Sequence, residues 1–340
     1  MRFDRLEIPD PEVDGITGAT AVVPDGHTVQ SGFVWMPTFS MQANLYLQVT
    51  EPATGATSYV LPTQQFCWPM QPMPGMQPGG NWLGSMLLPP PRNPVECVQW
   101  FYLPGPLQHL RMARLVGVEE LPGYATEVGR GVPPQMTVRA TRLRYAYSWG
   151  GGAWEEDVYL NLTYDQPNGW TAIWWCSAYA LRAPGGTLDE RTALLLVPML
   201  SLRLTLDWSA MLDHAQSRFR QEVRRQQTNP GPGGAIWAPM QPLGEVWRQK
   251  QGEIREGHRV LWNVKQAAHD RQNLAFRAMV PGLHTYVDPF DSRPVELPNE
   301  AVTYWTCKEG KIIASEEFSF DPPEGITDEW RPMSRYAPPA

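Results

Sequence analysis

Residues 138–149 read VRATRLRYAYSW, and this stretch decides the fold. Aromatic or aliphatic side chains occupy every second position of its second half, with arginines between them. A period of two is typical of a half-buried β-strand. Residues 156–164 repeat the alternation after Gly150, Gly151 and Gly152, which tolerate the positive φ of a tight turn. The two stretches therefore predict a β-hairpin.

A third strand is predicted at residues 170–181, which carry aromatic side chains on both faces. Trp174 belongs to one face of this strand and Trp175 to the other. A strand that is apolar on both faces lies in a sheet that is covered on both sides. We therefore expect helices or a second sheet on each face of the central sheet.

Further elements flank this core. A short helix from about residue 187 and a fourth strand at residues 201–206 (SLRLTL) follow the third strand. Toward the N-terminus, residues 43–49 (ANLYLQV) and 58–61 predict another hairpin, whereas residues 1–29 are polar and rich in turn formers. The last 60 residues return to short alternating segments separated by turns, which predict a small β-meander.

Two helices are predicted between the strand-rich regions. Residues 207–227 have helical spacing, and the Pro-Gly run at residues 229–234 ends that helix. The second helix, from residue 242 or 243 to about 279, has an apolar residue at every seventh position. Such a period is typical of a helix that packs along one partner. The repeated residues are Trp247, Ile254, Leu261 and Ala268.

The second helix is too long for the first to cover. A helix of 35 residues runs roughly 50 Å and one of 20 residues about 30 Å. Part of the apolar stripe therefore needs the sheet, the C-terminal strands or another subunit as its partner. Of these three we favour a second chain.

These elements predict an α+β protein: an antiparallel β-sheet sandwich with packed helices, a long helix pair and a small C-terminal β-meander. Residues 1–206 form the predicted sheet domain, 207–280 the helical pair, and 281–340 the meander with a Pro-rich tail. Inside the first unit, residues 69–94 are dense in Pro and Met and predict a long loop.

Composition excludes several classes of function. The 340 residues are 42% hydrophobic, which is enough to bury the cores of ordinary domains and excludes wholesale disorder. The net charge of −7 argues against a nucleic-acid partner. The longest apolar run, at residues 193–200, contains a proline and is far shorter than the roughly 20 residues that span a membrane.

The compartment is inferred from the N-terminus and the cysteines. The opening MRFDRLEIPDPEVDG is charged and has no apolar stretch of the kind found in secretory signals. The four cysteines are scattered, and three lie close to aromatic residues, which predicts reduced thiols in the core. Together these features predict a cytoplasmic protein, unless a leaderless route exports it.

No local motif predicts catalysis. The six histidines are far apart, and the chain has neither an HExxH nor a GxSxG motif. The strongest enzyme signal is the pair Glu155 and Asp157, which share a strand face and could serve glycoside hydrolysis. Because Arg142 and Arg144 lie opposite, we favour a cross-strand ladder of ion pairs. No catalytic, metal-binding or cofactor-binding residue is predicted.

Apolar residues outside the expected core are candidates for an interaction surface. Methionines recur among the prolines at residues 70–76, with a tryptophan at each end of that run. Such a loop either covers the protein's own core or meets a partner, and we give the first interpretation somewhat more weight. The candidate interaction residues are Trp68, Met70, Met73, Met76, Trp82, Trp247, Ile254 and Leu261.

The order strand, strand, strand, helix, strand over residues 138–206 resembles the PsbP/Mog1-like group of α/β sandwich proteins. The aromatic entry GFVWMP at residues 32–37 and the step Leu200-Ser201-Leu202 belong to the same resemblance. Residues 287–304, continuing to 320–322 (FDP), are similar to segments of uncharacterised bacterial proteins that carry such a domain. The resemblance implies a scaffold for binding or assembly and carries over no functional residue.

We therefore predict a non-enzymatic structural, adaptor or chaperone-like component of a larger assembly, with a protein partner or a homo-oligomer. The alternative is a carbohydrate-binding or glycoside-hydrolysing protein that uses tryptophans with Glu155 and Asp157. Exposed rings beside carboxylates in a cleft would favour the sugar hypothesis, and buried rings would favour the scaffold.

Overall fold

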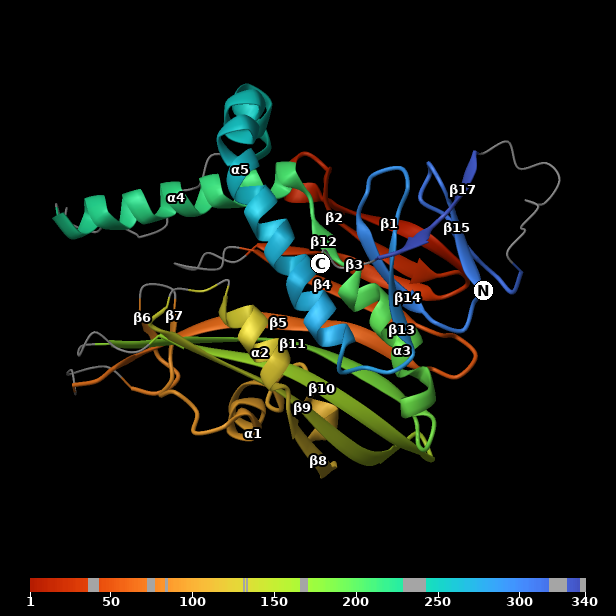
Figure 1. The fold of residues 1–340 in the computed structure, drawn as a ribbon. Helices are drawn as coiled ribbons and strands as arrows, with labels where there is room; N and C mark the ends of the chain where they lie inside the picture. Colours follow the sequence, from red (N-terminus) through yellow and green to blue (C-terminus); the bar gives the residue numbers. More distant parts are fainter. Residues whose placement is uncertain are drawn as a thin grey trace.

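The computed structural model has three β-sheets with helices packed on and between them (Figure 1). The sheets are antiparallel apart from one short parallel pair. This architecture confirms the predicted α+β sandwich. The structure describes residues 1–35, 43–71, 77–82, 85–130, 132, 134–165, 171–228, 243–317 and 329–336.

The largest sheet has nine strands and contains both predicted hairpins. Its strands lie in the order β3 (Thr28–Trp35), β4 (Ala43–Thr50), β5 (Thr57–Pro69), β11 (Thr171–Pro184), β10 (Gly152–Asp165), β9 (Met136–Trp149) and β8 (Arg114–Glu120). Two short strands, β6 (Asn81–Trp82) and β7 (Ser85–Leu87), lie beside β5. These last strands fall within the stretch predicted as a long loop.

Both faces of the nine-stranded sheet are covered, as β11 predicts. On one face Trp174 is fully buried with Leu143 and Leu160, under the segment from α1 (Pro94–Cys97) through the turns η2 (Val98–Tyr102) and η3 (Gln108–Leu110). On the other face Tyr159 and Leu181 pack in a second core with α3 (Leu188–Leu200). Trp175 is half-buried, so the sheet is covered less completely there. All four cysteines are buried.

The six-stranded sheet joins the two ends of the chain. Its strands lie in the order β12 (Arg203–Leu204), β2 (Ile16–Pro24), β1 (Arg2–Asp10), β16 (Ile312–Ser315), β15 (Thr303–Cys307) and β17 (Trp330–Pro332). Residues 1–29 are therefore largely strand, because Phe3 and Ile8 on β1 supply apolar anchors in a polar stretch. The predicted fourth strand, β12, pairs with β2 in this sheet.

The C-terminal region contributes to two sheets. The third sheet has three strands, in the order β14 (Pro294–Pro298), β13 (Leu283–Val287) and β18 (Ser334–Arg335). The other C-terminal strands, β15 to β17, pair with each other and reach β1 through β16. The predicted meander is thus divided, because β1 offers an edge on which β16 can extend the larger sheet.

Three further helices and one short turn complete the fold. They are α2 (Pro122–Gly129), α4 (Leu206–Thr228), α5 (Leu243–Arg277) and the turn η1 (Pro11–Val13). Helices α4 and α5 contact each other, and α5 also contacts α2 and β13. Figure 1 shows α4 and the first turns of α5 projecting from the sheets. Within the described residues, no helix is both long and apolar enough to cross a membrane.

The seven-residue stripe on α5 does not follow the face that packs on the body. Ile254 is half-buried beside Val13 and Met211, whereas Leu261 is 47% exposed. A straight helix drifts by about 20° per heptad relative to a seven-residue repeat, so such a stripe winds away from one partner. The buried face instead includes His258 and Phe276.

Candidate functional site

The predicted interaction residues fall in two places. Trp68 is half-buried on β5, and Met70 is exposed at the edge of a pocket of about 370 Å³ that Pro90 and Ile173 also line. Ile254 and Leu261 lie on α5, far along the chain. The remaining candidates, Met73, Met76 and the side chains of Trp82 and Trp247, lie outside the described residues.

An exposed aliphatic patch lies on the side of α5 that faces away from the body. We call it the α5 patch: Val260 is 75% exposed, Leu261 47% and Val264 60%. Val264 lies four residues from Val260 and three from Leu261, so it neighbours both on the helix surface. Leu261 therefore belongs to a second apolar surface of α5 that no described residue covers.

The carboxylates predicted as a possible hydrolytic pair are held by the rest of the sheet. Arg144 forms a bidentate pair with Asp157, with Nε–Oδ1 and Nη2–Oδ2 distances of 2.8 Å. Arg142 lies 3.8 Å from the same carboxylate. Glu155 accepts a hydrogen bond of 3.2 Å from the backbone of Gly186. The ion pairs of Asp157 confirm the predicted salt bridges, and Glu155 takes a different partner.

The residue between them, Glu156, is on the opposite face and organises a different site. Its carboxylate is fully buried, and the Tyr59 and Tyr147 hydroxyls and His109 Nε2 all contact it. The Tyr147 and His109 contacts are both 2.9 Å long. Because an ionised carboxylate only accepts hydrogen bonds, His109 Nε2 carries the proton in this arrangement.

Local structure explains how these side chains meet. Glu156 pairs across the sheet with Tyr145 on β9 and Arg182 on β11, so all three belong to one face. His109 comes from the 3-10 turn η3, where the buried Leu107 and Leu110 anchor the backbone on either side. The loop thus fixes His109 over the sheet, and the sheet fixes Glu156 beneath it.

Burial and the charge of Glu156 together keep the neighbouring phenols protonated. Burial, followed by the Glu156 charge, raises the pKa of Tyr59 and of Tyr147 well above the ordinary value for tyrosine. The same two causes raise the pKa of Tyr145 to about 12. Both contacting tyrosines therefore donate to Glu156 throughout the physiological pH range, so the carboxylate is stabilised by neutral partners.

A pocket of about 360 Å³ opens beside this cluster. Its volume falls in the range of small-molecule sites. Apolar groups of Leu47, Val60 and Leu61 form part of the wall. The polar and aromatic lining, from β3, β4, β5, β11 and η3, consists of Gln30, Tyr46, Gln48, Thr57, Tyr59, His109 and Arg182.

Arg182 supplies the positive charge of the pocket. Its guanidinium carbon lies 4.9 Å from the ring centre of Trp149 and 5.5 Å from that of Trp154. Its Nη2 atom is 3.4 Å from Thr57 Oγ1, and its buried Nε has no hydrogen-bond partner among the described residues. A cation stacked on two indoles is preorganised, since the rings restrict its side chain.

The arrangement can bind a polar ligand and move a proton. Gln30 and Gln48 offer amide donors and acceptors, and Arg182 offers a cation. His109, 28% exposed, has Nε2 committed to Glu156, which leaves Nδ1 as a possible acceptor. Across the described ranges, no group of three or more His, Cys, Asp or Glu residues is placed to hold a metal ion.

The sequence contained one signal for this site. Glu156 occupies the same alternating face as Val158, Leu160 and Leu162, so a charged residue stands where an apolar one is expected. That departure marks a buried carboxylate that needs partners. His109 gave no such signal, because a 3-10 turn 47 residues away has no periodicity that points to β10.

Comparison with known proteins adds no family to this description. No protein-family model matches the chain, and a search of curated proteins finds no match. The resemblance to the PsbP/Mog1-like group therefore stays a prediction.

Proposed function

We propose that this protein is a non-enzymatic component of a larger protein assembly, with a structural, adaptor or chaperone-like role. The α5 patch is the observation that supports the proposal. Exposing three aliphatic side chains on one helix surface to water is energetically unfavourable, and such surfaces commonly mark protein contacts. Met70, exposed beside its own mainly apolar pocket, offers a second contact area.

Large aromatic side chains support the same proposal. Trp174 and Trp208 are fully buried, and Tyr102, Tyr286 and Tyr304 are buried with them. Rings placed in this way hold the sheets and helices together rather than forming an exposed row for a sugar chain. Helices α4 and α5 extend beyond the sheets, where another protein could bind them (Figure 1).

The test replaces Val260, Leu261 and Val264 with serine and purifies the full-length protein from its native source. We expect wild-type protein to carry a companion, or a second copy, in fixed stoichiometry, and the triple variant to lose it. The matched control replaces the exposed polar residues Glu256, Arg259 and Asn263, which lie next to the patch on α5. A wild-type protein that is monomeric and without a companion contradicts the proposal.

Carbohydrate binding is the second candidate, and the pocket beside Glu156 favours it. Amides, hydroxyls, an arginine and the exposed ring of Tyr46 surround one cavity, a combination suited to a polyhydroxylated ligand. The proposal moves the carbohydrate site away from Glu155 and Asp157 and requires binding without hydrolysis.

Calorimetric titration with mono- and disaccharides tests the second candidate. We expect Gln48→Ala and His109→Ala to abolish binding, because both side chains line the pocket. Glu155→Gln should bind as wild type, since its side chain belongs to the opposite face of β10. Loss of binding in Glu155→Gln with retention in His109→Ala would reverse the assignment.

A further inference from the structure

A third pocket is lined by several arginines. It has a volume of about 290 Å³ and lies where β12, the start of α4 and the middle of α5 meet. Three arginines from different parts of the chain line it: Arg203, Arg255 and Arg293. Asp207 is the one carboxylate among its lining residues in the described part of the chain, and two carboxylates outside the lining, Asp270 and Asp291, pair with Arg203 and Arg293.

The buried arginine is fixed from several sides. Arg203 is 7% exposed, and its Nη1 contacts Asp270 Oδ1 at 2.5 Å and Gln266 Oε1 at 3.2 Å. Its Nη2 donates to the backbone carbonyl of Pro294 at 3.2 Å. A guanidinium held by three groups keeps one position, which is the condition for preorganised recognition.

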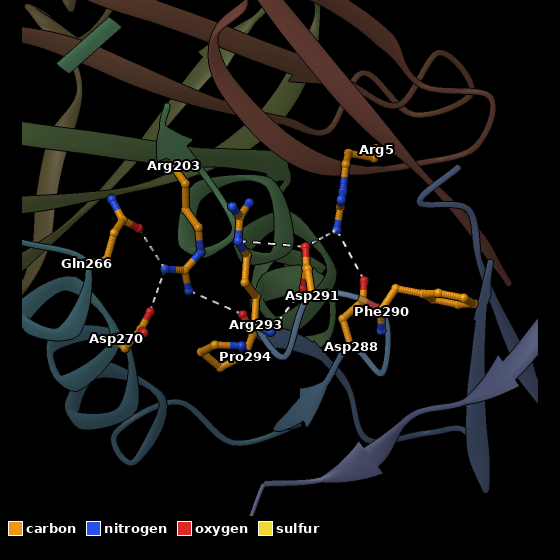
Figure 2. Close-up of polar contacts among 9 residues, drawn as sticks. All are labelled: Arg5, Arg203, Gln266, Asp270, Asp288, Phe290, Asp291, Arg293 and Pro294. Atoms are coloured by element: carbon orange, nitrogen blue, oxygen red, sulfur yellow. Dashed lines mark hydrogen bonds and ion pairs between the residues drawn. The ribbon is translucent and has the colours of Figure 1, made fainter. Parts of the chain in front are cut away.

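Arg293 lies beside Arg203 and retains free donors (Figure 2). Its Nε is 3.7 Å from Asp291 Oδ2, and Figure 2 shows both terminal nitrogens without a contact among the residues drawn. Asp291 is shared with Arg5, whose Nη2 also reaches Asp288. The like charges of these two guanidinium groups repel each other, so an anion bound in the pocket would relieve that repulsion.

The start of α4 faces the same pocket. Thr205, Leu206 and Asp207 are lining residues at the beginning of a helix of 23 residues. The first N–H groups of a helix have no partner within it, and the helix dipole favours negative charge there. Arg255 adds a cation, although its Nε also pairs with Asp207 Oδ1 at 3.1 Å.

We propose that this pocket binds the phosphate group of a small phosphorylated molecule or inorganic phosphate itself. The three or more terminal oxygens of a phosphate can use the guanidinium groups of the three lining arginines from separate directions. A carboxylate has two oxygens and one charge, so it would leave donors unused. Thr20 and Trp262 also line the pocket. The Thr20 hydroxyl could contact a further polar group of the ligand, and the Trp262 ring a flat one.

Titration of the full-length protein with inorganic phosphate tests the proposal, with acetate as the carboxylate comparison. We expect millimolar or tighter binding of phosphate, weaker binding of acetate, and a loss of affinity as chloride is added. Arg255→Gln and Arg293→Gln should each weaken phosphate binding about tenfold, because each removes a charged hydrogen bond. Both side chains are about half exposed, so the variants should fold, which circular dichroism verifies.

Arg259→Gln is the matched control, since Arg259 is an exposed arginine of α5 that does not line the pocket. It should bind phosphate as the wild type does. Equal affinity for phosphate and acetate, wild-type affinity in both pocket variants, or an equal loss in Arg259→Gln would overturn the proposal. Phosphorylated small molecules are then compared with inorganic phosphate, and a further gain in affinity would assign the rest of the pocket to the organic part.

Discussion

Glu156 and Asp157 are neighbours in β10 and are both fully buried, yet their surroundings differ in kind. Asp157 faces two arginines, one of them in bidentate contact. Glu156 faces two phenols and an imidazole, beside a pocket. Alternation along a strand placed the two carboxylates in different chemical environments one residue apart.

The difference separates a structural carboxylate from a candidate functional one. Guanidinium groups neutralise Asp157 permanently, because arginine does not lose its proton in proteins. The partners of Glu156 are two phenols and an imidazole, and two of these three residues, Tyr59 and His109, also line the pocket. We therefore expect changes around Asp157 to alter stability, and changes around Glu156 to alter binding as well.

The largest effect is expected from Arg144→Leu. This change leaves the buried Asp157 charge without its bidentate partner, which typically costs about 3–5 kcal/mol of unfolding free energy. Urea denaturation measures the loss. The double variant Arg144→Leu with Asp157→Leu should recover most of it, because the unpaired buried charge is gone and Asp189, which also pairs with Arg144, is exposed to solvent. A single-variant cost below about 1 kcal/mol would show that Asp157 does not depend on this pair.

A third buried carboxylate, Glu296, extends the comparison, because it has neither kind of compensation. Thr285 Oγ1, at 3.5 Å, is its one side-chain hydrogen-bond partner among the described residues. Burial raises the pKa of Glu296 to about 7, with Asp270 adding to the increase and Arg203 opposing it. The folded protein therefore holds this proton more tightly than the unfolded chain, and stability is lost as the pH rises from 4.5 to about 7.

Glu296→Gln should remove that loss. The unfolding free energy of the variant minus that of the wild type should be about 3 kcal/mol larger above pH 7 than below pH 4.5. This is the free energy that corresponds to the raised pKa of Glu296. Unfolding free energies of both proteins at the two extremes give the result. The buried His269, whose pKa burial lowers to about 3, contributes equally to both proteins and cancels in the difference. A pH-independent difference would contradict the assignment.

Glu156→Gln should lower the unfolding free energy by about 1–3 kcal/mol, less than Arg144→Leu does. The amide keeps one acceptor oxygen but lacks the negative charge that the three hydrogen-bond donors around Glu156 stabilise. The pKa of Tyr145 should fall below about 12, since the Glu156 charge is the second cause of its elevation after burial. Chemical denaturation and tyrosine titration by ultraviolet absorbance measure the two effects. An unchanged pKa of Tyr145 in the variant would show that the Glu156 charge does not raise it.

The smallest effect is expected from Trp149→Ala, at about 0.5–1 kcal/mol. Trp149 is 54% exposed, so its loss removes mainly the cation–π contact with Arg182 and the edge-on ring contact with Trp154. Trp100→Ala, at another exposed indole, is the matched comparison. A cost above about 2 kcal/mol would mean that Trp149 supports the hairpin as well as the arginine.

Local pattern was enough to predict the centre of the fold. The alternation in residues 138–164 determined which side chains share a face, and the pairing of β9 with β10 follows from it. Partners far apart in sequence could not be predicted in this way. Arg2 pairs with Ile313 and Arg203 with Thr20, and in each case the choice depends on which sheet edge is left open.

The candidate site also divides into residues that a local pattern reveals and partners that are distant in sequence. Glu155 and Asp157 attracted attention because two carboxylates share a face, whereas the single Glu156 between them contacts two residues that line the pocket, Tyr59 and His109. Its partners Tyr59 and His109 come from β5 and from a turn, and only the folded sheet brings them to β10. The aliphatic residues of α5 were visible in the sequence, but the drift of the stripe decided which of them became exposed.

The pairing of β1 with β16 also affects how the chain is made. β1 can pair with β2 as soon as both leave the ribosome, but its other edge waits for Ile312 and Ile313, roughly 310 residues later. At about 5–20 residues per second this delay lasts roughly 15–60 s. During that time one edge of β1 in the nascent chain has no strand partner. Nascent chains on the same mRNA could pair through these edges, so aggregation on polysomes is a risk during synthesis.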